Sequence, residues 1–418
     1  MLNLRFHKTL YQASSKAQLT TWLVPGLFIL CLMAVESYLV YEIYATRFPG
    51  TADFFSRWYG ARELIFNGRN PYAADVEAEI QLAMFGARRP PDQDQVNFAY
   101  PLYTIYLFWP LTLVSYAWAQ AIWMVVLQFI LLGTTILLFN LTRWKPPVWL
   151  FAATLVWALF FYPAARAIML GQFSIIVFSG LVIALWSLAN GKDKLAGAIL
   201  PLTTIKPQMV FLVIPFMLWW AWRQKRWAFI NAFGLSAAAL LLTSLLWLPG
   251  WPFHFFNVML AYTGYVNHGS PLENMTGKFL PGLDHLLNPM IVIALIALLL
   301  WQWRLALTAQ PGIFLWVVNL TLLITNLIAF RSATTNHVVL YLTIFILFKR
   351  LAPAHWKIVA GQVFGLIGLW VLFLTTIDKS RSSNFEAIFM HGFLPSLLII
   401  IYLLDWRRLK MVTPEIKV

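Results

Sequence analysis

The chain has 418 residues, of which 61% are hydrophobic and only 11% are charged, whereas about a quarter of the residues of a soluble domain are charged. This composition excludes a soluble globular protein and predicts an integral membrane protein. The net charge of +14 does not indicate nucleic acid binding, because the basic residues lie in short clusters between apolar segments.

Apolar stretches of membrane-crossing length occur along the whole chain. A helix needs roughly 20 apolar residues to cross a ~30 Å hydrocarbon core. Stretches of that length begin near Trp22, Ala117, Ala228, Pro311 and Ile358. Such long runs are typical of helices, not of the short alternating strands of a barrel. We predict an all-α polytopic membrane protein, a single domain over residues 1–418 with about 10 to 12 transmembrane helices.

The first apolar helix, from about Thr20 to Tyr44, follows a basic N-terminus over residues 1–19. Cytoplasmic loops of membrane proteins carry an excess of Lys and Arg. We therefore expect residues 1–19, the tail 406–418 and the basic loops between spans to be cytoplasmic. These loops contain Arg143 and Lys145, Lys192 and Lys194, Arg223, Lys225 and Arg226, and Lys349 and Arg350.

Residues 45–100 form the longest polar stretch and are predicted to be an outer loop. Apolar residues such as Phe54, Trp58 and Leu64 recur among its charges at helical spacing. This pattern predicts amphipathic helices that lie along the membrane interface. A second outer loop is predicted over residues 249–289.

Residues 101–115 allow two topologies, because a short apolar piece can be either a span or a re-entrant segment. If the piece does not cross, the loops around Arg143 and Lys192 are cytoplasmic. Lys206 is then the outward tip of a broken helix pair in residues 195–222. If the piece crosses, that pair becomes one kinked span and the same loops lie outside. The charge rule favours the first topology.

Ionisable residues at membrane depth are costly and often mark a site. Asp53 follows the first helix, where it either takes part in a reaction or caps the next helix. Lys206 lies in an apolar stretch, where it either binds an anion or extends to the water layer. Arg331 and His337 flank a Ser/Thr-rich turn, and for each the alternative is an ordinary surface or hydrogen-bonded group.

No motif of a soluble enzyme competes with these candidates. The sequence has no P-loop, no glycine-rich dinucleotide turn, no His-Glu-x-x-His motif and only one cysteine. We predict neither a metal site nor a cofactor.

Short polar motifs follow one another along most of the chain. They are Asp53 followed by Ala61-Arg-Glu-Leu-Ile-Phe-Asn-Gly68-Arg-Asn-Pro71-Tyr72, then Phe98-Ala-Tyr100-Pro101-Leu102, Gly171-Gln172, Leu195-Ala-Gly197 leading to Lys206-Pro207, Glu273-Asn-Met-Thr-Gly277, and Arg331-Ser-Ala-Thr-Thr-Asn-His337. In this order they resemble the motifs of glycosyltransferase family 87, polytopic enzymes of the GT-C class. The chain departs from the family pattern at Leu102, where a second proline is usual, and in the loop around Glu273.

The resemblance implies an inverting glycosyltransferase at the outer membrane face. Such an enzyme moves a hexose, typically mannose, from a polyprenyl-phosphate donor to a hydroxyl group of a lipid-linked or cell-envelope glycan. A phosphate leaving group needs cationic stabilisation and one base, whereas a glycosidase needs two carboxylates. By resemblance, Asp53 is the general base, and Lys206, Arg331 and His337 bind the donor phosphate. Tyr72, Tyr100, Gln172 and Asn274 are further candidates for contacts to the sugar or the acceptor.

Two alternatives compete with this function. A transporter or flippase of a glycolipid also uses broken helices and intramembrane charges, but no inverted repeat is visible. A ligase that joins whole polysaccharides to a lipid is expected to carry several arginines in its late outer loop, and residues 249–289 contain none.

Overall fold

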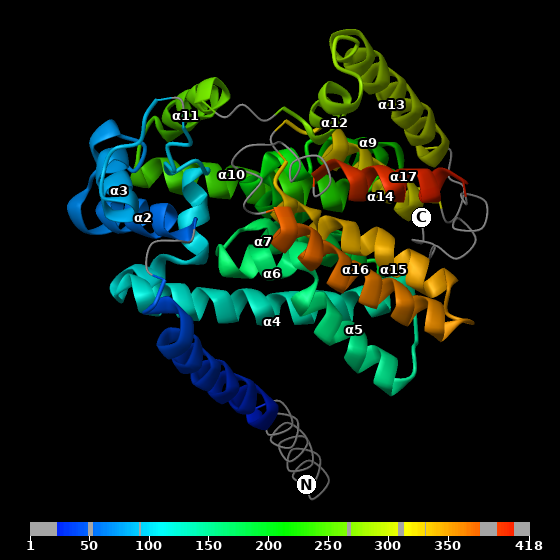
Figure 1. The fold of residues 1–418 in the computed structure, drawn as a ribbon, viewed down its shortest axis with the longest axis horizontal. Coiled ribbons are helices and arrows are strands. Elements are labelled where there is room, and N and C mark those ends of the chain that lie inside the picture. Colours follow the sequence, from blue (N-terminus) through cyan, green and yellow to red (C-terminus); the bar gives the residue numbers. More distant parts are fainter. Residues whose placement is uncertain are drawn as a thin grey trace, which may run out of the picture.

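The structure is a computed structural model that describes residues 23–48, 53–91, 93–265, 269–307, 313–330, 332–376 and 391–404. These residues form helices and the turns between them, and no strand occurs among them, so the all-α prediction is confirmed for this part of the chain. The helices α4 and α10 run along the long axis of the molecule, and α2, α3 and α11 lie at one end of it (Figure 1).

The helices follow one another along the chain in three stretches. In the first, the helix Leu23–Ala45 ends in the π-helical turn η1 (Tyr41–Ala45) and precedes α2 (Phe54–Asn67), α3 (Ala74–Phe85), the 3-10 turns η2 (Leu102–Leu107) and η3 (Trp109–Leu113), α4 (Tyr116–Thr142), α5 (Val148–Phe160), α6 (Tyr162–Met169) and α7 (Ser174–Ala189). The second contains α8 (Asp193–Ile199), η4 (Leu200–Ile205), η5 (Pro207–Met209), α9 (Val213–Arg223), α10 (Trp227–Trp247) and α11 (Trp251–Tyr265). The third contains α12 (Pro271–Phe279), α13 (Asp284–Leu307), α14 (Ile313–Ile328), η6 (Thr334–Leu340), α15 (Tyr341–Arg350), α16 (His355–Thr376) and α17 (Leu394–Leu404).

Five helices among the described residues are long and apolar enough to cross a membrane, namely Leu23–Ala45, α4, α10, α13 and α16. The helices α5 and α6 bend by 52° at their junction and give a sixth candidate if they act as one span. Large apolar side chains such as Leu235 and Leu246 on α10 are exposed, as contact with lipid requires. The chain is therefore a helical membrane protein, whereas the number of about 10 to 12 crossings stays a prediction.

The short apolar helices α7 and α14 form the interior of the bundle. The helix α14 is buried along nearly its whole length, including Asn319 and Asn326. The amide nitrogens of these asparagines donate to the carbonyl oxygens of Leu315 and Leu322, each at 3.0 Å. A helix that is apolar all round belongs inside a bundle. The long helix α4 accordingly packs along α7, and α13 packs along α14.

The basic loops lie together at the end of the molecule where α4 ends. Trp186 on α7 donates to the side-chain oxygen of Asn140 on α4, at 2.8 Å. Trp144, just after α4, packs on Phe348 of α15 with ring centroids 5.6 Å apart. These contacts bring together the basic loops that follow α4, α7 and α15, which supports the prediction that they share one side of the membrane.

The segment from α8 to α9 leaves this end and returns to it. Asp193 at the start of α8 forms an ion pair with Arg226 just after α9, with 2.9 Å between oxygen and nitrogen. Both ends of the segment therefore lie on the same side, and the chain turns back near Lys206. Gly197 of α8 approaches α10 so closely that a Cβ atom would lie 2.1 Å from the carbonyl oxygen of Phe229. The segment has the shape of a broken helix pair, not of one kinked span.

Residues 101–115 also return to the side from which they start. Tyr100 lies just before them, and the guanidinium carbon of Arg57 on α2 is 4.7 Å from the centroid of its ring. Near their other end, the carbonyl oxygen of Leu111 accepts a hydrogen bond of 2.9 Å from the indole of Trp58, also on α2. The 3-10 turns η2 and η3 thus begin and end beside one helix. This geometry supports the topology in which the piece does not cross.

The polar stretch of residues 45–100 contains two helices, α2 and α3. The helix α2 buries Phe54, Trp58 and Leu64. Gly68 ends α2 with a φ of +64°, a left-handed conformation that favours glycine. The predicted helices are therefore present, and their position along the membrane interface stays a prediction.

Candidate functional site

Interruptions of several helices meet at the end of the molecule that carries α2 and α3. Asp53 precedes α2, Gln172 and Ser174 lie at the junction of α6 and α7, Lys206 separates η4 from η5, and Asn336 lies in η6. Hydrogen bonds connect these five side chains, which we call the polar cluster. Polar groups freed at such breaks in a membrane protein need partners within the protein or in a water-filled cavity.

The carboxylate of Asp53 points into the polar cluster. Asp53 occupies the N-cap position of α2, but its side chain makes no capping hydrogen bond. Its Oδ2 instead accepts a hydrogen bond from the side-chain amide of Gln172. The alternative in which the side chain of Asp53 caps the next helix is therefore wrong. Arg57, one turn further along α2, donates to the backbone carbonyl of Asp53.

Gly171 allows the junction of α6 and α7 to lie against the start of α2. Its φ is +65°, and a Cβ atom there would lie 2.6 Å from the Cβ of Phe54 and 3.1 Å from the ring of Trp123. The backbone nitrogen of Phe54 also donates to the carbonyl oxygen of Leu170, at 3.2 Å. A residue without a side chain is needed here, and the next residue, Gln172, is thereby held beside Asp53.

The ammonium of Lys206 lies inside the protein, because only 5% of the residue is exposed. It donates to Oε1 of Gln172 at 2.6 Å, to Oγ of Ser174 at 2.9 Å and to Oδ1 of Asn336 at 3.1 Å. The alternative in which Lys206 extends to the water layer is therefore wrong. All three partners are neutral, and Lys206 makes no ion pair within the described part of the chain. The ammonium of Lys206 is therefore available to form an ion pair with an anionic ligand.

Two predicted tyrosines extend the network from the polar cluster. The hydroxyl group of Tyr100 donates to Oε1 of Gln172 at 3.2 Å. The hydroxyl group of Tyr72 donates to the backbone carbonyl of Tyr100 at 2.6 Å. Both tyrosines are buried. Tyr72, Tyr100 and Gln172, which lie far apart in the sequence, therefore belong to one network with Asp53.

His337 follows Asn336 of the polar cluster and is only 1% exposed. Neither ring nitrogen of His337 has a hydrogen-bond partner among the residues described. The alternative of an ordinary surface group is therefore wrong, and an unpaired buried imidazole is available for a ligand. The predicted partner Arg331 lies outside the described residues.

Asn274 is the predicted contact residue that the structure does not connect to the polar cluster. It lies on α12, and its side-chain nitrogen donates to the carbonyl oxygen of Gly269 at 3.4 Å. The preceding Glu273 forms a capping box with Ser270 at the start of this helix. The local motif thus stabilises the beginning of α12, and a role of Asn274 in sugar binding stays a prediction.

Ser174, Asn336 and Arg57 were not among the site residues assigned from the sequence. Ser174 lies two residues after Gln172, and Asn336 directly precedes His337, so both are inside or beside motifs named above. Arg57 is four residues after Asp53, which is one helical turn. Spacing alone gave no reason to choose these positions over their neighbours.

The polar cluster combines one carboxylate with one buried ammonium, joined by a single amide. A carboxylate can accept a proton, and an ammonium can stabilise an anion. Among the described residues, no group of three or more His, Cys, Asp and Glu side chains could hold a metal ion. The arrangement suits a transfer reaction whose leaving group is an anion.

Comparison with known proteins adds one finding. The family model of glycosyltransferase family 87 matches residues 98–326, more than half of the chain. The matched range includes Tyr100, Gln172, Lys206 and Asn274. No curated protein and no solved structure matches the chain.

Proposed function

Because the chain belongs to glycosyltransferase family 87, we propose that it moves a hexose, mannose foremost, from a polyprenyl-phosphate donor to a hydroxyl group of a lipid-linked or cell-envelope glycan. The protein is a membrane glycosyltransferase by its family and its apolar helices. The proposal adds the donor, the class of acceptor and an inverting mechanism at the outer face, with both termini in the cytoplasm.

The observation that carries the proposal is the short path from Asp53 to Lys206 through Gln172. The amide of Gln172 donates to the carboxylate of Asp53 and accepts from the ammonium of Lys206 at 2.6 Å. A base and a cation thus lie on either side of one amide. This arrangement suits a reaction in which the acceptor loses a proton and negative charge develops on the leaving group of the donor.

In the proposed reaction, Asp53 takes the proton from the acceptor hydroxyl group while that oxygen attacks the anomeric carbon. The bond between the anomeric carbon and the phosphate oxygen breaks, and the phosphate leaves with the electron pair. Lys206 stabilises the charge of the phosphate, together with Arg331 and His337. Attack from the side opposite to the leaving group inverts the anomeric carbon, so a β-linked donor gives an α-glycoside. Tyr72, Tyr100 and Asn274 are proposed to contact the sugar or the acceptor.

Membership in a family of glycosyltransferases removes the ground for a transporter or flippase. The polysaccharide ligase also loses support, because residues 249–289 lack the arginines that its late outer loop is expected to carry. A hexosyltransferase whose donor has one lipid phosphate needs fewer cations than such a ligase. The polar cluster accordingly contains a single buried cation, Lys206.

The proposal is tested with membranes that contain the full-length protein and a radiolabelled polyprenyl-phosphate mannose. We expect Asp53→Asn to lower the transfer of label at least about 100-fold, because the amide cannot act as a base. The matched control is Asp94→Asn, which changes an exposed carboxylate. Its Oδ1 accepts a hydrogen bond from the backbone nitrogen of Val96, and the oxygen of an asparagine amide can accept the same bond. Transfer that is undiminished in Asp53→Asn would refute the catalytic role of this residue.

A further inference from the structure

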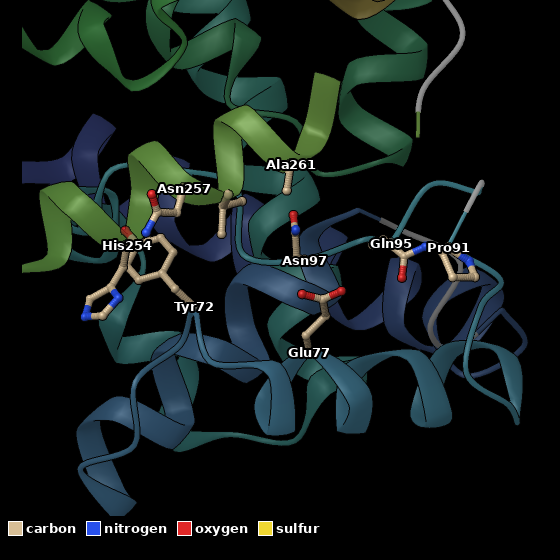
Figure 2. Close-up of a pocket in the computed structure, with 9 residues that line it drawn as sticks. Tyr72, Glu77, Pro91, Gln95, Asn97, His254, Asn257 and Ala261 are labelled. Carbon is tan, nitrogen blue, oxygen red and sulfur yellow. The ribbon is translucent and has the colours of Figure 1, made fainter. Parts of the chain in front are cut away.

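A cavity of about 480 Å³ lies between α3 and α11 (Figure 2). Its volume is within the range of about 300–1,000 Å³ that small-molecule sites usually have. Figure 2 shows the carboxylate of Glu77 on α3 directed toward Asn97, with Tyr72, His254 and Asn257 at one end. Apart from Tyr72, the residues that line it lie outside the network around Asp53.

The polar groups that line the cavity are suited to hydroxyl groups and not to phosphate. They are the carboxylate of Glu77, the amides of Gln95, Asn97 and Asn257, and the rings of Tyr72 and His254. Amides both donate and accept hydrogen bonds, and a carboxylate accepts them, as sugar hydroxyl groups require. No Lys or Arg is among the lining residues. The lining itself therefore offers no cation to a phosphate.

Two stacked aromatic rings lie at one end of the cavity. The rings of Tyr72 and His254 are nearly parallel, with an angle of 17° and centroids 6.4 Å apart. Such rings contact the apolar face of a sugar, while the polar groups around them bind its hydroxyls. Elsewhere in the lining, the pKa of the Glu77 carboxyl is raised, chiefly by burial. A hydrogen bond from Asn97 and the charge of Arg88 lower it by less.

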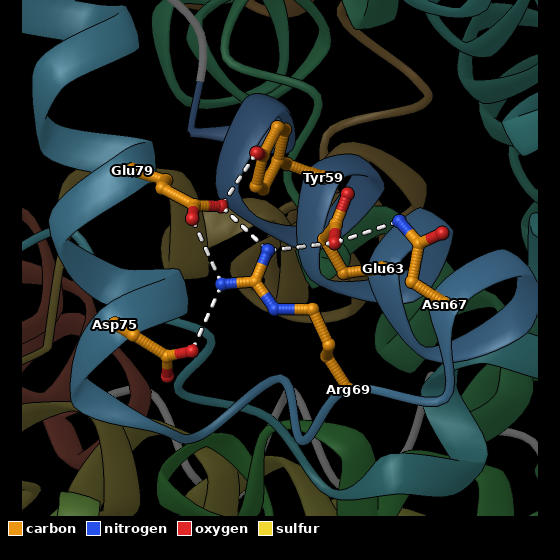
Figure 3. Close-up of polar contacts among 6 residues, drawn as sticks. All are labelled: Tyr59, Glu63, Asn67, Arg69, Asp75 and Glu79. Atoms are coloured by element: carbon orange, nitrogen blue, oxygen red, sulfur yellow. Dashed lines mark hydrogen bonds and ion pairs between the residues drawn. The ribbon is translucent and has the colours of Figure 1, made fainter.

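The wall formed by α3 is fixed in place by an arginine clamp (Figure 3). The guanidinium of Arg69 pairs with Glu63 of α2 at 2.8 Å, and with Asp75 and Glu79 of α3 at 2.9 and 2.8 Å. Glu79 also accepts a hydrogen bond of 2.8 Å from Tyr59 of α2. Because α3 is tied to α2 in this way, this wall of the cavity does not have to form when a ligand arrives, which lowers the cost of binding.

Tyr72 belongs both to the cavity wall and to the network around Asp53. Its ring lines the cavity, and its hydroxyl group donates to the backbone of Tyr100. The side chain of Tyr100 reaches Gln172, which in turn contacts Asp53. A ligand in the cavity is therefore separated from the proposed base by two tyrosines.

We propose that the cavity between α3 and α11 binds one sugar unit of the acceptor glycan, while a neighbouring unit that carries the reacting hydroxyl group extends past Tyr72 and Tyr100 to Asp53. This inference rests on the function proposed above and adds the class of ligand and its place. The donor phosphate binds at Lys206, and the uncharged, hydroxyl-rich sugar unit of the acceptor binds on the other side of Tyr72 and Tyr100.

The test uses the full-length protein in lipid nanodiscs with methyl α-mannopyranoside as the probe, followed by saturation-transfer NMR. We expect binding to the unaltered protein, and about a fivefold loss in affinity for Glu77→Gln and for Asn257→Leu, the cost of about one hydrogen bond in each case. The matched controls are Glu42→Gln and Asn231→Leu, which change exposed residues of other helices. The controls are expected to bind the probe as the unaltered protein does.

Saturating polyprenyl-phosphate mannose distinguishes the two possible sources of a bound sugar. A probe signal that persists with the donor present supports an acceptor site, whereas its displacement would assign the cavity to the sugar of the donor. Absence of binding, or equal binding by the cavity variants and the controls, would overturn the proposal. Consumption of labelled donor by the same preparation tests the transferase function separately, so the two failures remain distinguishable.

Discussion

Gln172 uses both ends of its amide, and this fixes the orientation of the groups around it. Its oxygen accepts from Lys206 at 2.6 Å and from Tyr100 at 3.2 Å, while its nitrogen donates to Asp53. A flipped amide would place its nitrogen against two donors. The side chain therefore has a single favourable orientation, which holds the carboxylate of Asp53 in one direction.

The three hydrogen-bond partners of Lys206 are neutral, and this leads to a prediction about donor binding. We expect Lys206→Gln to lower kcat/KM for polyprenyl-phosphate mannose by about 10- to 100-fold, because a hydrogen bond between charged groups contributes about 1.5–3 kcal/mol. Thermal stability is expected to stay close to that of the unaltered protein. The glutamine amide still donates a hydrogen bond, and the cost of burying a charge disappears. Transfer kinetics and thermal unfolding in detergent measure the two effects.

Lys349→Gln is the matched control for this prediction. Lys349 is partly buried and lies on α15, near the end of α4 that carries Arg143, and not in the polar cluster. Its substitution is expected to leave donor kinetics unchanged. Equal kinetics for Lys206→Gln and the unaltered protein would contradict the proposed binding of phosphate at Lys206.

The junction between α6 and α7 shows how one helix break positions a reactive group. Gly171 has a positive φ and lies against Phe54, whereas Gly191, at the other end of α7, has a φ of +69° and open space where a Cβ atom would lie. The two glycines share the same backbone conformation and differ only in their surroundings. A comparison of the two positions therefore separates backbone strain from packing.

Substitution by alanine at these two glycines gives a paired prediction. We expect Gly191→Ala to lower the free energy of unfolding by about 1 kcal/mol through strain alone. Gly171→Ala is expected to lower it by about 2–4 kcal/mol, because packing against Phe54 adds to the strain. Denaturant unfolding of the detergent-solubilised protein measures both values.

Activity gives an independent measurement for the same pair. The added methyl group at Gly171 displaces α2 from Gln172, so hexose transfer at a temperature where the variant is folded should also fall. Gly191→Ala, which lies away from the polar cluster, should retain activity. Equal losses of stability for the two variants would show that the close approach to Phe54 is not maintained in solution.

The elements that could be predicted from the sequence are those whose apolar runs reach membrane length, such as α4 and α10. The two 3-10 turns of residues 101–115 could not be assigned, because a short apolar piece has the same composition whether it crosses or turns back. Asp53 and Lys206 were found because a charge in an apolar context is costly. Their link through Gln172, and the contact of Lys206 with Asn336, depend on the packing of distant helices.

The polar cluster and the basic loops lie at opposite ends of the molecule. The helix α4 begins at Tyr116 and ends beside the basic loops. The ring of Tyr116 packs on that of Phe55 of α2, with centroids 4.8 Å apart. Its 27 residues span about 40 Å, enough to cross a membrane. Since basic loops favour the cytoplasmic side, this arrangement supports a reaction at the outer face.

Labelling of single cysteines tests this orientation of the whole molecule. The only natural cysteine, Cys31, is first replaced by alanine. In intact cells, a membrane-impermeant maleimide is expected to label Gln93→Cys, which is exposed near α3, and not Lys192→Cys, which is exposed in the basic loop after α7. Lys192→Cys should react once the membrane is opened, because the residue is on the protein surface. Labelling of both positions in intact cells would place the basic loops outside and contradict the return of residues 101–115 to α2.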